Sequence, residues 1–67
     1  MSPENDTRFE ALLQYLRRSR GFDFSAYKRA SLMRRVEKRM QTVGVESYED
    51  YRGYLEAEPR EFGVWQL

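Results

Sequence analysis

Apolar residues recur three and four positions apart in the first part of the chain, which is the spacing of one face of an amphipathic helix. This stripe consists of Phe9, Leu12, Leu13 and Leu16. Thr7 and Glu10 have the spacing of a capping box, and Gly21 suits the left-handed residue that follows a helix. The pattern predicts a helix over residues 7–20, preceded by a polar, disordered segment over residues 1–6.

A second helical pattern covers residues 26–42 and is closed by Gly44. Asp23 or Ser25 can supply its N-terminal cap. The apolar face of this predicted helix consists of Leu32, Val36, Met40 and Val43, with Met33 beside it.

Two shorter helices are predicted over residues 47–58 and 60–67. Ser47 and Asp50 repeat the capping spacing, and Pro59 suits the first turn of a new helix. Nearly all aromatic rings are expected in the core, with the hydroxyls of Tyr48, Tyr51 and Tyr54 near water. Because no stretch alternates with the period of a strand, the predicted fold is all-α, a compact bundle of three to four helices.

Charge is distributed unevenly between the two parts of the chain. Up to Arg39 there are ten Lys/Arg and five Asp/Glu, a balance of +5, and from Met40 onward two against six, a balance of −4. Such asymmetry points to a charged partner, although charge on a small domain can also serve only to solvate its surface.

The positive charge follows one edge of the second predicted helix. On a helical wheel, Lys28, Arg35 and Arg39 fall in a line beside the apolar face, while Arg34 and Lys38 lie nearer the solvent pole. Like charges at this spacing destabilise a helix by a few tenths of a kcal/mol, and only Glu37 offers a counter-charge on the same helix. These five cations are therefore the candidate partner-binding residues, facing an anionic surface.

Two kinds of anionic partner fit such a helix. Nucleic acid is the generic candidate, but the chain has a net charge of only +1 and its acidic part would repel a phosphate backbone. An acidic protein surface, in particular a Glu-rich helix, is the other candidate, since charge complementarity steers brief encounters.

Catalytic chemistry is sparse in this sequence. With no cysteine and no histidine, it excludes disulfides, zinc sites of the usual kind and a thiol or imidazole catalyst. The glycines are isolated, so no phosphate-binding loop is present. No catalytic, cofactor-binding or metal-binding residue is predicted. There is no signal peptide or membrane-spanning run, and the expected compartment is the cytoplasm.

Over residues 9–62, the chain closely resembles the amino-terminal, all-helical domain of CheR-type chemotaxis receptor methyltransferases. The resemblance rests on Arg20–Arg29, Ser31-Leu32, Arg34-Arg35-Val36, Lys38-Arg39-Met40, Gly44, Ser47-Tyr48, Asp50-Tyr51, Tyr54-Leu55, Pro59 and Glu61-Phe62. It implies a parent enzyme that transfers a methyl group from S-adenosylmethionine to glutamate side chains on chemoreceptor helices. It also implies that Lys28, Arg35 and Arg39 match basic positions that face the acidic receptor region.

The resemblance further implies a linker and a cofactor-binding α/β domain after Phe62, whereas this sequence ends at Leu67. We therefore expect an excised domain or a stand-alone relative without methyltransferase activity or tight cofactor binding of its own. Its expected role is a substrate-recognition or regulatory module, whose partner is an acidic helical region of a chemoreceptor or its own catalytic domain. The alternatives are a small nucleic-acid-binding domain and a purely structural brace for the catalytic domain.

Overall fold

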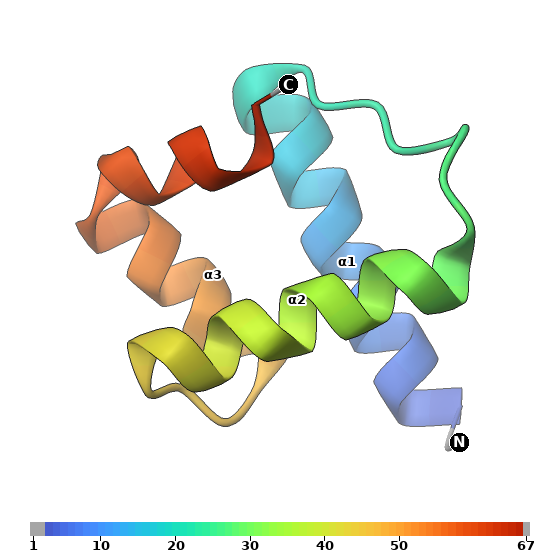
Figure 1. Cartoon of the computed structure of the whole chain (residues 1–67), viewed down its shortest axis with the longest axis horizontal. Coiled ribbons are helices and arrows are strands. Elements are labelled where there is room, and N and C mark those ends of the chain that lie inside the picture. Colours follow the sequence, from blue (N-terminus) through green and yellow to red (C-terminus); the bar gives the residue numbers. More distant parts are fainter. Residues whose placement is uncertain (1–2, 67) are drawn as a thin grey trace.

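The computed structural model describes residues 3–66, and within them it contains helices and no strand. The elements are α1 (Pro3–Arg20), α2 (Arg29–Val43), α3 (Tyr48–Ala57) and a 3-10 helix, η1 (Pro59–Trp65). Helix α2 crosses α1, and both α3 and η1 lie to the left of α1 in the view of Figure 1. The prediction of an all-α bundle of three to four helices is confirmed.

The core forms where the apolar faces of these elements meet. Phe9 and Leu16 of α1, Val36 of α2 and Leu55 of α3 are completely buried. Each such side chain contributes about 1.5–3 kcal/mol by leaving water. The remaining buried apolar side chains are Leu12, Leu32, Met33, Met40, Tyr48, Tyr51, Phe62 and Trp65. The predicted apolar stripes of the first and second helices therefore do face the core.

Helix α1 begins earlier than the sequence pattern predicts. It starts at Pro3, so the expectation of disorder over residues 1–6 is wrong for Pro3 to Asp6, and residues 1–2 lie outside the described residues. Thr7 lies within the helix and does not begin it. Proline is well tolerated in a first helical turn because its missing N–H would have no intrahelical partner there.

Helix α2 begins later than predicted, at Arg29 and not at residue 26. The Asp23 carboxylate accepts a hydrogen bond from the Ser25 backbone N–H at 2.9 Å, which keeps the pKa of that carboxyl below its usual value. The Tyr27 N–H donates to the Phe24 carbonyl at 3.0 Å. These local bonds form a turn. The cap residue is Lys28, with extended backbone angles and no side-chain capping bond, so the predicted caps are wrong.

The remaining helix ends largely follow the sequence. The Ser47 side chain accepts a hydrogen bond from the Asp50 N–H at 3.0 Å, as the capping spacing predicts. Gly21 and Gly44 have φ angles of 71° and 80°. The fourth segment begins at Pro59, but it is a tight 3-10 helix ending at Trp65, and Leu67 of the predicted range lies outside the described residues.

Two glycine-to-alanine changes should have opposite effects on stability. Gly44→Ala should cost about 1–2 kcal/mol, because an L side chain is strained at the positive φ of this cap. Gly53→Ala lies inside α3, where a Cβ would meet nothing within 4 Å, and should stabilise by about 0.5–1 kcal/mol. Urea unfolding of the two variants tests this directly, and a destabilising Gly53→Ala would contradict the described path of α3.

Candidate interaction surface on helix α2

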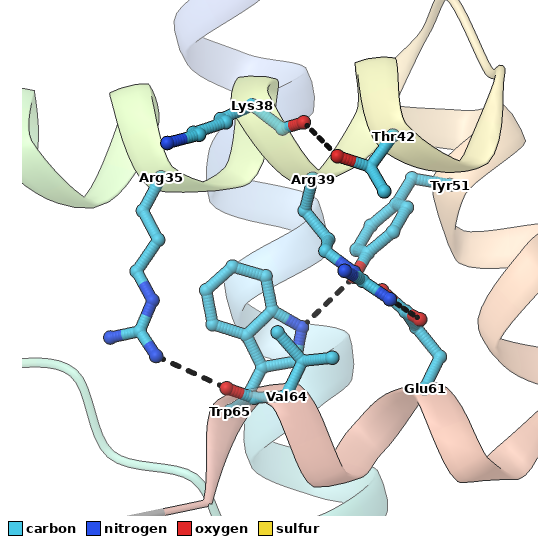
Figure 2. Close-up of polar contacts among 8 residues, drawn as sticks. All are labelled: Arg35, Lys38, Arg39, Thr42, Tyr51, Glu61, Val64 and Trp65. Atoms are coloured by element: carbon cyan, nitrogen blue, oxygen red, sulfur yellow. Dashed lines mark hydrogen bonds and ion pairs between the residues drawn. The ribbon is translucent and has the colours of Figure 1, made fainter.

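The five candidate cations of α2 and its cap divide into two groups. Arg35 and Arg39 extend from α2 to η1, whereas the Lys38 side chain lies along the helix without reaching towards η1 (Figure 2). Lys28, Arg34 and Lys38 are all exposed. The two groups must be considered separately, since Arg35 and Arg39 contact η1 and the other three have no side-chain partner among the described residues.

Arg39 binds the carboxylate of Glu61 through two nitrogens. Its Nε donates to Oε2 at 2.6 Å and its NH2 nitrogen donates to Oε1 at 3.0 Å. The Glu61 side chain is only 4% exposed and that of Arg39 is 33% exposed. A bidentate, charge-assisted pair of this kind is among the stronger polar contacts in proteins, so Arg39 is firmly occupied by η1.

Glu61 has two further buried neighbours. The Tyr51 hydroxyl donates to Oε2 of Glu61 at 2.6 Å, and Nε1 of Trp65 donates to the Tyr51 hydroxyl oxygen at 3.0 Å. Arg39, Tyr51, Glu61 and Trp65 form what we call the Glu61 network, which joins α2, α3 and η1 (Figure 2). The expectation that the Tyr51 hydroxyl lies near water is therefore wrong.

The network sets the protonation states of its members. Burial alone would raise the pKa of Glu61, but the hydrogen bonds from Arg39 and Tyr51, together with the Arg39 charge, outweigh it and lower this pKa. The pKa of Tyr51 is raised, first by burial and then by its bond to Glu61. Glu61 is consequently an anion and Tyr51 a neutral donor at physiological pH.

Arg35 is also held by η1. Its NH2 nitrogen donates to the backbone carbonyl of Val64 at 3.1 Å, and its guanidinium carbon lies 5.2 Å from the centroid of the Trp65 ring. Cation–π contacts at such a distance are worth about 0.5–1 kcal/mol when exposed. Two of the three cations in the line that the wheel identified, Arg35 and Arg39, thus contact η1, whereas Lys28 does not.

Near the start of α2, Arg29 is engaged with α1. It pairs with Glu10 at 2.6 Å and its guanidinium carbon lies 5.2 Å from the Phe9 ring centroid. Glu37 accepts a hydrogen bond from the Tyr48 hydroxyl at 2.9 Å. Burial, and then this bond, raise the pKa of Tyr48 to about 12.

The solvent face of α2 has a different character. Among the described residues, no side chain forms an ion pair or hydrogen bond with the side chains of Lys28, Arg34 or Lys38. Arg34 and Lys38 are four residues apart, or about 6 Å along the helix axis. We call these two residues the outer ridge; Lys28 is separate from it, as the cap residue before the first turn of α2. Exposed residues near them on α2 include Ala30, one turn before Arg34, and the polar residues Ser31, Gln41 and Thr42.

The division between engaged and solvent-facing cations was missed by sequence reasoning, because a helical wheel gives angles and not neighbours. One signal was available. Glu61 directly precedes Phe62 in a segment that also contains Trp65. Its carboxylate was therefore a candidate to lie beside the core. A buried carboxylate needs a cation, and the predicted line of Arg35 and Arg39 could have supplied it.

Comparison with known families assigns the domain. Residues 7–64 match the family described as CheR methyltransferase, all-alpha domain. The chain therefore belongs to this family, as the sequence resemblance indicated. No curated protein and no solved structure gave a match.

The family implies S-adenosylmethionine as a cofactor of the whole enzyme, but the described residues do not fit it. The hollow between α1 and the following loop measures about 250 Å³, and other hollows on the described surface measure about 410–500 Å³, so the fit is decided by their polar groups and not by their size. Several polar residues of the hollow beside α1 are paired, Arg29 with Glu10 and Asp23 with Ser25. Among the described side chains, no buried nitrogen or oxygen lacks a hydrogen-bond partner that a ligand could supply.

The described residues offer neither a metal cluster nor a membrane-spanning helix. Within residues 3–66, no cluster of three acidic side chains has metal-site geometry. No helix in this part of the chain has the length and apolar character needed to cross a membrane.

Glu61→Gln should remove a pH-dependent part of the stability. At pH 7 we expect a loss of about 1–3 kcal/mol, because a charge-assisted pair becomes a neutral contact in a buried site. Because folding lowers the pKa of Glu61, its contribution is present above the ordinary glutamate value of about 4.3 and disappears as pH falls through the lower folded value. Urea unfolding from pH 7 to 2 should therefore show a smaller acid loss in the variant.

The matched control is Glu58→Gln, which removes the same charge from an exposed side chain close to Glu61 in sequence. It should leave both the stability and its acid dependence nearly unchanged. Equal effects of the two substitutions would contradict the role given to the Glu61 network.

The full chain should not bind S-adenosylmethionine with micromolar affinity, since no buried side-chain nitrogen or oxygen among the described residues lacks a hydrogen-bond partner that the cofactor could supply. Isothermal titration calorimetry with the cofactor alone is the measurement. Saturable heat with a Kd in the micromolar range would show that this domain does hold the cofactor, contrary to our expectation.

Proposed function

We propose that this domain is the substrate-recognition or regulatory module of an S-adenosylmethionine-dependent methyltransferase that modifies chemoreceptor glutamates in the cytoplasm. In this proposal, the solvent face of α2 contacts an acidic helical region of the receptor. The supporting observation is that Lys28, Arg34 and Lys38 are exposed and lack a counter-charge among the described residues, whereas Arg29 and Arg39 are paired.

The repulsion between the two cations of the outer ridge supports a functional role for them. Arg34 and Lys38 repel each other at i, i+4 spacing, which disfavours the helix by a few tenths of a kcal/mol. A receptor helix with carboxylates would remove this repulsion on binding. Exposed ion pairs are weak individually, at about 0.2–1 kcal/mol each, which suits an encounter that must be brief enough for turnover.

The structure changes the relative importance of the five candidate cations. Arg39 is neutralised by Glu61, and Arg35 is directed at Val64 and Trp65. In the proposal, these two position η1 against α2 and contribute only indirectly to the partner surface. Lys28, Arg34 and Lys38 make the direct contacts.

A structural brace is the second candidate, and the Glu61 network favours it. A network that joins α2, α3 and η1 would give a following domain a rigid attachment. A nucleic-acid-binding role has less support, because the net charge of the chain is only +1 and exposed acidic residues such as Glu56 and Glu58 occupy another part of the surface.

Charge reversal of the outer ridge separates these functions. Arg34→Glu with Lys38→Glu should weaken binding to a Glu-rich helical peptide about 5- to 50-fold at low salt, since two attractions become repulsions. The loss should shrink as salt is raised, because exposed charges are screened. Fluorescence anisotropy with a labelled peptide gives both quantities.

The control is Arg18→Glu with Arg60→Glu, which makes the same change in net charge at exposed positions of α1 and η1. It should preserve most of the binding. Equal losses for the two double variants would mean that only net charge matters, and unchanged binding in the ridge variant would favour the brace. Tight, sequence-specific DNA binding at physiological salt would instead favour the nucleic-acid function.

A further inference from the structure

Arg35 of α2 satisfies the last turn of a different helix, η1. The last three carbonyls of a 3-10 helix have no donor within the helix, because each would need an N–H three residues further on. In η1, the Gly63 carbonyl accepts a hydrogen bond from the Gln66 N–H at 3.4 Å. The Val64 carbonyl instead accepts from the NH2 nitrogen of Arg35 at 3.1 Å (Figure 2). We call this bond, together with the contact between the Arg35 guanidinium and the Trp65 ring, the Arg35 cap.

The Arg35 cap is more easily displaced than the other arginine contact with η1. Arg39 makes two hydrogen bonds to a carboxylate that is only 4% exposed. Arg35 is exposed and makes one hydrogen bond, to a neutral carbonyl. A carboxylate from outside the domain carries a full charge and can accept two parallel bonds from a guanidinium, which a single carbonyl oxygen cannot do. An external carboxylate can therefore displace Arg35 from η1 but not Arg39.

We propose that the Arg35 cap is a conformational switch, in which a carboxylate of the acidic partner helix draws Arg35 away from Val64 and Trp65 and so loosens the last turn of η1. This inference rests on the proposed function and adds a structural response to binding. In the free domain, Arg35 contributes to the partner surface only indirectly, and partner binding makes its contribution direct.

The position of Arg35 beside the outer ridge supports this exchange. Lys38 is three positions further along α2, and side chains at this spacing are neighbours on a helix surface, with about 5–6 Å between their Cβ atoms. Figure 2 shows that the two side chains diverge, since Lys38 lies along α2 and Arg35 extends to η1. A helix that rests on Arg34 and Lys38 thus brings carboxylates close to the Arg35 guanidinium.

Release of Arg35 would act on the end of η1 and leave its other attachment in place. The Val64 carbonyl loses its donor, and the Trp65 ring loses a guanidinium carbon that lies 5.2 Å from its centroid. Arg39 keeps its pair with Glu61, so η1 stays attached to α2 at that point. A seven-residue 3-10 helix is longer than this poorly hydrogen-bonded form usually runs, so its last turn depends on contacts from outside the helix.

The coupling between partner and η1 acts in both directions. If a bound carboxylate weakens the Arg35 cap by some factor, the intact cap weakens partner binding by the same factor. The cap consists of one exposed hydrogen bond and one ring contact. A contact of this size sets a factor of about 2- to 10-fold.

The experiment uses Trp65, which is the one tryptophan of the chain, as a reporter of η1. The full chain is titrated with a Glu-rich helical peptide that contains no tryptophan or tyrosine. The emission maximum of Trp65 should move to longer wavelength and its quenching by acrylamide should increase, both saturating at the Kd measured by anisotropy. The Gln66 amide, which bonds within the last turn, should exchange its hydrogen about 2- to 10-fold faster in the complex.

Arg35→Gln and Arg34→Gln are a matched pair, since each removes one exposed positive charge from α2. Arg35→Gln should make Trp65 more accessible to acrylamide before any peptide is added, and saturating peptide should then change it little. Arg34→Gln should weaken peptide binding and keep the full Trp65 response at saturation. Both variants should retain the fold, which circular dichroism checks, because Arg39 still holds Glu61.

Saturable peptide binding with no change in Trp65 quenching would overturn the switch and leave the proposed function standing. A full Trp65 response in Arg35→Gln, or an equally reduced response at saturation in Arg34→Gln, would also overturn it. Absence of saturable peptide binding to the unmodified domain would overturn the proposed function and the switch together.

Discussion

The buried carboxylate of Glu61 is the constraint on which the arrangement of this domain depends. A charge with 4% exposure must be paired and hydrogen-bonded, or its desolvation would oppose folding. Arg39 from α2 and Tyr51 from α3 meet that requirement, and Trp65 in turn donates to Tyr51. Because these partners come from three different elements, satisfying one carboxylate fixes η1 against both α2 and α3. In a chain of 67 residues with no cysteine, such a polar network adds specificity to a small core.

The same constraint determines which cations remain available at the surface. Arg39 is paired with Glu61 and Arg35 contacts η1, so this edge of α2 packs against η1 although both side chains remain partly in contact with solvent. Arg34 and Lys38 lie beyond the reach of η1 and retain their charge at the surface. Membership of the CheR all-alpha family places this surface on a domain of a methyltransferase family. One helix thus combines a structural edge with an exposed cationic ridge.

Particular elements show why sequence reasoning succeeded or failed. The buried faces of the first two helices, with Leu12, Leu16 and Val36, were predictable. An apolar stripe at helical spacing is a local pattern, and its favourable arrangement is to face the core. The start of α2 was not predictable, since Asp23 could either cap a helix or accept a hydrogen bond from Ser25. In the structure it accepts the bond from Ser25, which forms a turn before the helix. The pairing of Arg39 was only indirectly signalled, because Glu61 is 22 residues away in the sequence and nothing local selects Arg39 over the other cations. The prediction of five binding cations stays untested as a set.

By itself, the sequence determined the all-α class, the apolar faces of the first two helices, the family and the concentration of positive charge on one helix. These properties depend on residue type and short-range spacing, which folding does not alter. Only the tertiary structure decided which of those charges are paired, that the Tyr51 hydroxyl is buried, and that the last segment is a 3-10 helix held against α2. Each of these depends on groups far apart in the chain, and the desolvation of Glu61 is the physical reason that they come together.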